Sequence, residues 1–529
     1  MAKSNDHIYV LIKSLTDHER SIYRQSVETS NFGQAHMAFL ELIDAMEAYD
    51  EEKASFYCRT ELKVTNFSRF RKEVFDSLLA ILEKNRRSKS EQEEIDRQIR
   101  EVDVLIDKGL FDVARKHILS TKNRADRINY HHGKIEVLNR EIRIMQNRPG
   151  SKGEQKVVSL NEELDIYLQD YQTSNRYRTL YHFMLILVRS TFDGEVTKAS
   201  MQEIEKIMRH PLLQSDVEWP DIRSQMLYHS IHAKFARITG KHNDELQHQR
   251  NIVQLWKQDR NQIEANPSGY IKSLSILAEL HRGHNSYSKV EFNRMLAELQ
   301  AVVVNTYRDE TEQFAAVALL RLIDGLNGTP REFEVLLTEY IPQLLQDMNT
   351  RNRPLPQSRE LALYFNIAAA YFVHGSFSKA ADVISLIRNF TKTDSRQDIQ
   401  IFASILSNIL MYEMFDEATA ETFTRSNDRK LKNMALTLSL ESTCIKFLKK
   451  LRTTLPDQDI QRVFVPWRTE LLKLIKKNSR RQLLGLEEII CWLNSKISGG
   501  HIYAEYRKYI DESSVLSSPP DVSASSTAR

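Results

Sequence analysis

The chain has 529 residues, and 74 basic against 71 acidic side chains give a net charge of +3 that favours no class of partner. Only 15 Gly and 12 Pro are present, too few to punctuate a strand-rich fold, so long amphipathic helices are expected. Three scattered cysteines, Cys58, Cys444 and Cys491, exclude a disulfide framework and indicate a reducing compartment.

Residues 1–90 are predicted to form an N-terminal helical module. Two short helices are expected within 7–27, followed by amphipathic helices at 32–49 and 67–84, where apolar residues recur at i, i+3 and i+4. The next stretch, 84–101, is almost entirely polar, which fits either a solvated helix start or a flexible joint. The first module boundary is therefore expected there.

Residues 91–455 contain a repeated helix-pair pattern. The spacing of a tetratricopeptide unit is met by Tyr364, Ile367, Ala368, Tyr371, Gly375, Ala380 and Ile384, and its second half by Val102, Leu105, Gly109, Ala114 and Ile118. A weaker copy spans 222–256, with Glu245 where the other units have Ala. Such pairs bury their apolar faces only against neighbouring pairs, so the pattern predicts an all-α fold, an α-solenoid of irregular tetratricopeptide-like pairs.

The remaining elements follow from the same periodicity. Residues 148–155 are expected to form a loop, with helices resuming from Leu160. Pro456 and Pro466 predict a break, after which 456–512 would supply capping helices that end near residue 510. Residues 513–529 are Ser/Pro-rich and are predicted to be a disordered tail. Further helices are expected at 267–282, 289–305, 309–326, 331–348 and 396–415, and the best helix pair spans 360–390.

The sequence contains no recognisable catalytic motif. It lacks phosphate-binding glycine loops, a nucleophile elbow and an HExxH helix, so no catalytic, cofactor or metal residue is assigned. His229 and His232 stand three apart on a predicted helix without a convincing third ligand, which favours two surface histidines over a metal site. The pair His131–His132 is expected in a loop beside Gly133. An enzyme whose site assembles from distant repeats stays a third alternative.

A non-catalytic scaffold or adaptor that binds a protein or peptide is the leading functional hypothesis. In the best repeat, a groove-lining helix would present Phe365, Ala369 and Phe372, with Asn366 as a backbone-binding amide. The alternative for these aromatic residues is packing against the neighbouring repeat. No apolar run is long enough for a membrane span or a signal peptide, so the protein is expected to be cytoplasmic, without a membrane partner.

Two basic stretches, 59–89 and 446–481, support a second hypothesis, a nucleic-acid-binding or regulatory protein. Clustered cations could neutralise phosphates if the two stretches formed one surface. The other reading is that they are solvated helix faces. The candidate basic residues are Arg69, Arg71, Lys72, Arg86, Arg87, Lys473, Lys476, Lys477, Arg480 and Arg481.

Several segments together resemble a family of tetratricopeptide-like, all-helical Bacteroidetes proteins of about this length. The resemblance includes IYVLIKSLTDHERSIY (8–23), AYDEEKA (48–54) read as an acidic turn, FSRFRKEVFDSLL (67–79), EVDVLIDKGLFDVARKHI (101–118) and IICWLNSKISGGHIYAEYRK (489–508). The basic run from Lys84 to Lys89 and the Ser/Pro tail depart from the pattern. The resemblance implies a helical fold and supplies no activity, cofactor or site residue.

Overall fold

The structure is a computed structural model that describes residues 7–15, 17–27, 33–46, 49–84, 91–147, 151–193, 198–214, 218–282, 287–304, 306–351, 355–390, 396–414, 443–444, 446–448, 450, 460–477 and 484–516. Every regular element within these ranges is helical, which confirms the predicted all-α helical-repeat class. The chain forms two compact units, one of Met1–Ser90 with Thr350–Pro354 and one of Glu91–Asn349 with Leu355–Arg529. None of the described helices has the length and apolar character needed to cross a bilayer.

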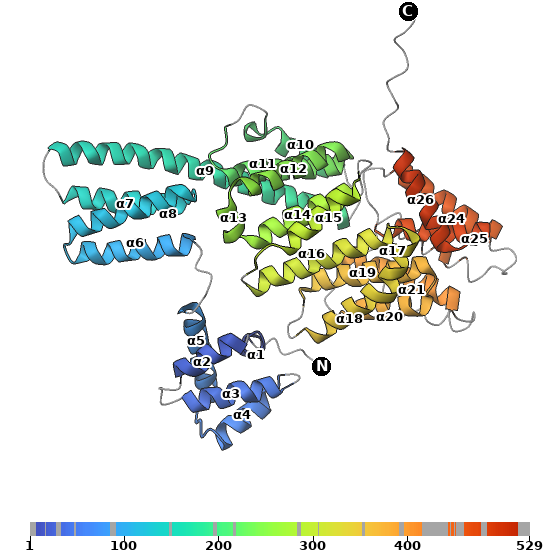
Figure 1. Cartoon of the computed structure of the whole chain (residues 1–529), viewed down its shortest axis with the longest axis horizontal. Coiled ribbons are helices and arrows are strands. Elements are labelled where there is room, and N and C mark those ends of the chain that lie inside the picture. The colour runs from blue at the N-terminus through green and yellow to red at the C-terminus, as the bar shows by residue number, and fades with distance from the viewer. Residues whose placement is uncertain are drawn as a thin grey trace, which may run out of the picture. The chain divides into compact units, whose positions relative to one another are not determined.

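The first unit is a small helical module (Figure 1). Its helices are α1 His7–Lys13, α2 Asp17–Val27, α3 Gly33–Ala45, α4 Glu51–Thr60 and α5 Phe67–Lys84. The apolar stripe predicted for α5 is its buried face, where the rings of Phe67 and Phe70 pack edge-on against Phe39 of α3. The segment expected as an acidic turn instead begins α4, because Asp50 accepts a hydrogen bond from the backbone N–H of Lys53, 3.0 Å away, and caps the helix.

The second unit begins with three helices packed on one another, and the third of them packs on one long helix. These are α6 Glu91–Asp107, α7 Phe111–Arg127, α8 His131–Gln146 and the 43-residue α9 Ser151–Asp193. A loop was expected at 148–155, but residues 151–155 are helical, because α9 already begins at Ser151 and includes Gly153. Residues 148–150 lie outside the described residues. At about 65 Å, α9 is long enough to serve two cores. Leu160 is buried with α6–α8, and Tyr177 is buried with α10 Lys198–Met208 and α11 Ile222–Thr239.

A series of antiparallel helices continues the second unit. After η1 Pro211–Leu213 and α11, it comprises α12 His242–Gln258, α13 Arg260–Ala265, α14 Pro267–Arg282, α15 Lys289–Gln300, α16 Tyr307–Leu326, α17 Pro330–Val335, the π-helical turn η2 Leu336–Tyr340, α18 Ile341–Thr350, α19 Gln357–His374, α20 Phe377–Arg388 and α21 Gln397–Met414. Consecutive helices pack on one another and share two large apolar clusters.

The last described helices join the core of α19–α21. They are α24 Val465–Lys477, preceded by the π-helical turn η4 Ile460–Phe464, then α25 Leu486–Ser498 and α26 Ile502–Leu516. Trp467 and Trp492 are fully buried in this core, with ring centroids 5.6 Å apart.

Two expectations for this region need correction. Pro466 does not break the chain: the π-helical turn η4 runs directly into α24, and the helix continues through Pro466, while Pro456 lies outside the described residues. The chain is still helical at Ser513, since α26 continues to Leu516; the rest of the predicted tail lies outside the described residues.

The three predicted helix pairs are present as hairpins. The turns of α6–α7, α11–α12 and α19–α20 each contain a glycine at positive φ, namely Gly109 (73°), Gly240 (72°) and Gly375 (84°). A side chain would disfavour that left-handed conformation, which explains glycine at the same place in each pair. Glu245, at the expected alanine position, is buried and lies 3.5 Å from Arg237.

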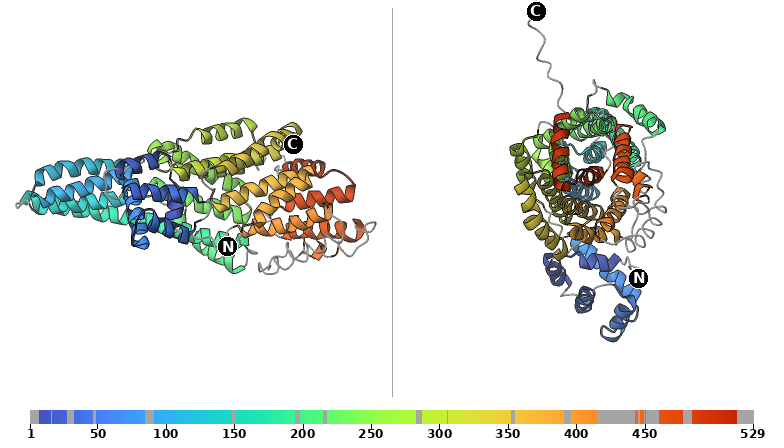
Figure 2. Two further views of the ribbon diagram at one scale, coloured as in Figure 1. Left: turned by 90° about the horizontal axis from the view of Figure 1, so that it is seen from below. Right: turned by 90° about the vertical axis from the view of Figure 1, so that its right-hand side faces the viewer.

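Helix contacts in the second unit form a closed circuit. In order, α9 contacts α11, α11 contacts α12, α12 contacts α14, α14 contacts α16, α16 contacts α19 and α19 contacts α21; α21 in turn contacts α9. The right-hand view of Figure 2 shows green, yellow and orange helices following one another around this circuit. Helix α9 therefore supports both the beginning of the helix series and α21.

Candidate functional site

A pocket of about 260 Å³ lies within the second unit where five segments meet. The start of α6, the α7–α8 turn, the middle of α9, the start of α11 and the α12–α13 turn all contribute side chains. Among the lining residues are Arg127, His131, Ser174, Arg178, Asp221 and Arg223. Polar side chains from separate elements thus converge on one concave surface, the usual arrangement of a ligand site.

The base of the pocket is a buried polar group that we call the Asp221 cluster: Asp221, His131, Ser174 and Ser224. One carboxylate oxygen of Asp221 accepts hydrogen bonds from His131 Nε2 at 2.7 Å and from Ser174 Oγ at 2.5 Å. The other accepts from the backbone N–H of Ser224 at 2.6 Å. Because these donors belong to α8, α9 and α11, the cluster fixes three helices against one another.

The local sequence explains why Asp221 stands at this point. It follows Pro220 and adopts an extended backbone conformation, with φ −158° and ψ 165°, directly before α11. Asp is a favoured N-cap residue because its short side chain reaches the free N–H groups of the first helical turn. The cap therefore also places the carboxylate where the imidazole of His131 and the hydroxyl of Ser174 can reach it.

Asp221 is an anion over the whole neutral range. Burial by itself would raise its pKa, but hydrogen bonds from His131, Ser174 and the Ser224 backbone, with the nearby His131 charge, outweigh burial and lower the pKa to about 2. The side chain of His131 is 10% exposed, and its Nδ1 has no hydrogen-bond partner among the described residues. One nitrogen of this buried ring is thus occupied by Asp221, and the other is unused.

The cluster does not form a nucleophile–base pair. The hydroxyl of Ser174 donates to Asp221, and the Ser224 hydroxyl donates to Ser174 at 3.1 Å, so neither serine is hydrogen-bonded to His131. Nucleophilic catalysis needs the hydroxyl within hydrogen-bond reach of its base. The observed arrangement instead anchors helices and places one imidazole in the wall of the pocket.

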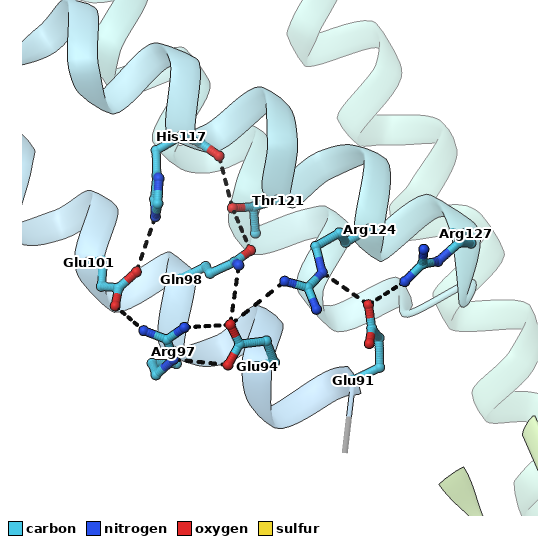
Figure 3. A network of polar contacts seen from close by, with 9 residues as sticks. All are labelled: Glu91, Glu94, Arg97, Gln98, Glu101, His117, Thr121, Arg124 and Arg127. Atoms are coloured by element: carbon cyan, nitrogen blue, oxygen red, sulfur yellow. Dashed lines mark hydrogen bonds and ion pairs between the residues drawn. The ribbon is translucent and has the colours of Figure 1, made fainter. Parts of the chain in front are cut away.

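The rim of the pocket is rich in arginine. Arg127 is held by Glu91, whose carboxylate lies 2.6 Å from Arg127 Nη2 and 2.9 Å from Arg124 Nε. This pair belongs to a polar network between α6 and α7, which also joins Arg97 to Glu94 and Glu101 (Figure 3). Arg178 and Arg223 are exposed, and within the described part of the chain they have no ion pair or side-chain hydrogen bond.

The predicted partner-binding residues of α19 lie elsewhere and do not form a surface. Phe365 is only 7% exposed, and its ring packs edge-on against Phe402 of α21, while Ala369 and Phe372 are fully buried. Asn366 donates to the carbonyl of Ala362, one turn earlier in the same helix. The groove interpretation of these residues is therefore corrected: α19 is central in the core, and neighbouring helices cover both of its sides.

Only some of the predicted basic residues can be located. Arg69 pairs with Glu73 at 2.9 Å and Arg71 lies 3.5 Å from Glu51, both in the first unit, where Lys72 is exposed on α5. Lys473 is exposed on α24. Outside the described residues, or without a described side chain, are Arg86, Arg87, Lys476, Lys477, Arg480 and Arg481. The prediction of one basic surface stays a prediction.

Histidine assignments also changed in part. His131 and His132 begin α8 and do not lie in a loop. His229 and His232 of α11 are joined by a third ring, His248 of α12, which the sequence did not link to them. Even so, among the described residues no group of three or more His, Cys, Asp or Glu side chains is placed to hold a metal ion.

Sequence reasoning did not find the pocket. Its lining residues span Gln92 to Gln262 and are brought together only by the packing of α9 against α8 and α11. The one local signal was the Pro220–Asp221 step before a helix, which predicts an N-cap but not its other partners.

Comparisons with protein-family models, with curated proteins and with solved structures found no match to this chain.

Proposed function

We propose that this chain is a non-catalytic binding protein, a helical-repeat scaffold or adaptor that holds a protein or peptide segment with the pocket as its contact point. The observation that supports the proposal is that hydrogen bonds fix the base of the pocket, while two arginines on its rim have no ion pair among the described residues. The Asp221 cluster ties three helices together, whereas Arg178 and Arg223 on the rim have no partner among the described residues. A site fixed before binding loses little conformational entropy when a partner arrives.

Binding fits the local geometry better than catalysis. The hydroxyl of Ser174 donates to Asp221 and that of Ser224 donates to Ser174, and His131 is held from the Nε2 side. In this proposal α6–α7, α11–α12 and α19–α20 are tetratricopeptide-like units of a solenoid, supported by the positive-φ glycine in each turn. A cytoplasmic location is part of the proposal, supported by three buried cysteine thiols without a disulfide.

The test is site-directed photo-crosslinking in the full chain. A photoreactive residue at Tyr171, which lines the pocket and is 40% exposed, should crosslink to one protein partner in an extract of the source cells. The matched control position is Val290, which is 81% exposed on α15 and does not line the pocket. Equal crosslinking at both positions, or none at Tyr171, would contradict the proposal.

The same extract also tests the alternative that the chain binds nucleic acid. We would repeat the capture at two salt concentrations, with and without nuclease. A protein partner at Tyr171 should survive nuclease treatment. Loss of every crosslink after nuclease or at the higher salt would favour nucleic acid and the basic stretches, because phosphate contacts weaken steeply with salt.

A further inference from the structure

We propose that the pocket is an oxyanion site: it binds a carboxylate or phosphate group between Arg178 of α9, Arg223 of α11 and the imidazole of His131. The inference deepens the proposed function by naming the chemistry of the group that the partner would insert. It stands on three observations about charge, hydrogen bonding and size.

The first observation is that both carboxylates that line the pocket already accept hydrogen bonds from groups other than the two arginines. Asp221 is contacted by His131, Ser174 and the Ser224 backbone, so its oxygens are occupied by donors that no arginine supplies. The other carboxylate of the lining, Asp259, caps α13 by accepting from the N–H of Asn261 at 3.0 Å. The guanidinium groups of Arg178 and Arg223 are therefore left for a ligand, whereas Arg127 on the same rim is neutralised by Glu91.

The second observation is the unused nitrogen of His131. This side chain is nine-tenths buried, lines the pocket and has an Nδ1 without a partner among the described residues. Nδ1 itself is sealed from solvent, so an oxyanion in the pocket reaches it only after a small shift of the lining on binding. An imidazolium has a proton on each nitrogen, so the ring can hold Asp221 through Nε2–H and the ligand through Nδ1–H.

The third observation is the match between the arginine pair and the group it would bind. The guanidinium is a planar fork that forms two parallel hydrogen bonds with a carboxylate or phosphate. Arg178 and Arg223 come from different helices, which the Asp221 cluster holds together through Ser174 and Ser224. The volume of about 260 Å³ exceeds that of the charged group alone, so part of a side chain can enter with it.

The test uses three probes on the purified full chain: inorganic phosphate, an N-acetyl phosphoserine amide and an N-acetyl glutamate amide. Isothermal titration at low chloride should give saturable binding for wild type, weaker as salt rises. The double variant Arg178→Gln/Arg223→Gln should bind at least tenfold more weakly. The control Arg176→Gln removes an exposed arginine of α9 that does not line the pocket, and should bind as wild type does.

The probes identify the source of the bound group, and the variants test the site. A preference for the phosphoserine or the glutamate probe over inorganic phosphate identifies a partner side chain, whereas phosphate alone binding as well identifies a free anion. No saturable binding by any probe, or equal binding by the double variant and the control, overturns the site. Thermal melts of both variants check that the exposed substitutions leave the fold intact.

The inference and the proposed function can fail separately. A partner that still crosslinks at Tyr171 in the double variant would retain the function and remove the oxyanion site. Probe binding without any protein partner would do the reverse.

Discussion

The Nδ1 atoms of His229 and His248 lie 3.0 Å apart across the interface of α11 and α12. At that distance one nitrogen must carry a proton and the other must accept it, so the pair is stable only while at least one ring is neutral. His232 stacks on His248 with ring centroids 5.1 Å apart, and its Nε2 lies 3.2 Å from the carbonyl of Leu213. Three imidazoles thus share one half-buried site.

This site should make the second unit sensitive to acid. Burial, followed by the charges of His248 and His232, lowers the pKa of His229 to about 4, below the unfolded value of 6.5. The folded state therefore binds fewer protons, and its stability, complete above pH 6.5, is lost as pH falls toward 4. A shift of this size in a fully buried group would correspond to about 3 kcal/mol, but this site is only half-buried and solvent screens its charges, so a loss of about 1–2 kcal/mol is expected. The charge of Asp244 raises the pKa of His248, so it opposes the loss of stability in acid at that ring alone.

Urea denaturation between pH 4 and pH 7 is the measurement. The substitution His229→Gln should flatten the loss of stability with falling pH. His242→Gln is the matched control, since His242 is exposed at the start of α12. An equally steep loss in both variants would show that the imidazole site is not responsible.

Glu488 should have the opposite pH dependence. It is buried in α25, and burial, with the neighbouring charge of Glu487, raises its pKa to about 7. The folded state therefore favours the neutral acid, and stability falls as pH rises from 4.5 through 7. The variant Glu488→Gln should be more stable than wild type by about 1–3 kcal/mol at pH 8, with no gain at pH 4. Denaturant melts at both pH values test this, with the exposed Glu339→Gln as a neutral control.

The Asp221 cluster should dominate the stability of the α8–α9–α11 junction. Asp221→Asn removes the charge and leaves the donors of His131, Ser174 and Ser224 to share one amide oxygen, at a cost of roughly 2–4 kcal/mol. Asp259→Asn is the matched substitution, because Asp259 also caps a helix but accepts only the Asn261 N–H, and should cost about 1 kcal/mol or less. Equal midpoints in thermal melts of the two variants would contradict this assignment.

The two glycines that flank α25 should tolerate alanine unequally. Gly485 and Gly499 both have positive φ, 75° and 69°. A Cβ at Gly485 would lie 1.9 Å from the buried ring of Phe402, whereas nothing lies within 4 Å at Gly499. Gly499→Ala should therefore cost only the left-handed strain, about 1–2 kcal/mol, and Gly485→Ala several kcal/mol. Similar melting temperatures would mean that Phe402 can move aside.

Sequence periodicity predicted helices better than it predicted their ends or their exposed faces. Of the apolar stripe predicted on α5, Phe67, Phe70, Val74 and Leu78 are buried, because apolar spacing reports a local property, whereas Leu79 is 44% exposed. The start of α9 was missed, since Gly153 signals a loop but lies in the first turn of this long helix. For Phe365 and Phe372 the groove and the core both stayed open as predictions, because a sequence does not state how many neighbours a helix has.

The candidate site could be found only from the folded structure. His131, Ser174 and Asp221 are 43 and 47 residues apart along the chain, so no spacing rule connects them. His248 joined His229 only through the pairing of α11 with α12. Cap chemistry at Asp221 was readable from the chain, and its remaining partners were not.

The return of α21 to α9 has a consequence for how this protein can change over evolution. An open stack of helix pairs can gain or lose a pair at little cost, because each pair meets only its two neighbours. Here an inserted or deleted pair between α11 and α21 would displace α21 from α9, where it now makes contact. The number of pairs is thereby fixed. Variation in length should accumulate in the connections between helices, and relatives should differ there.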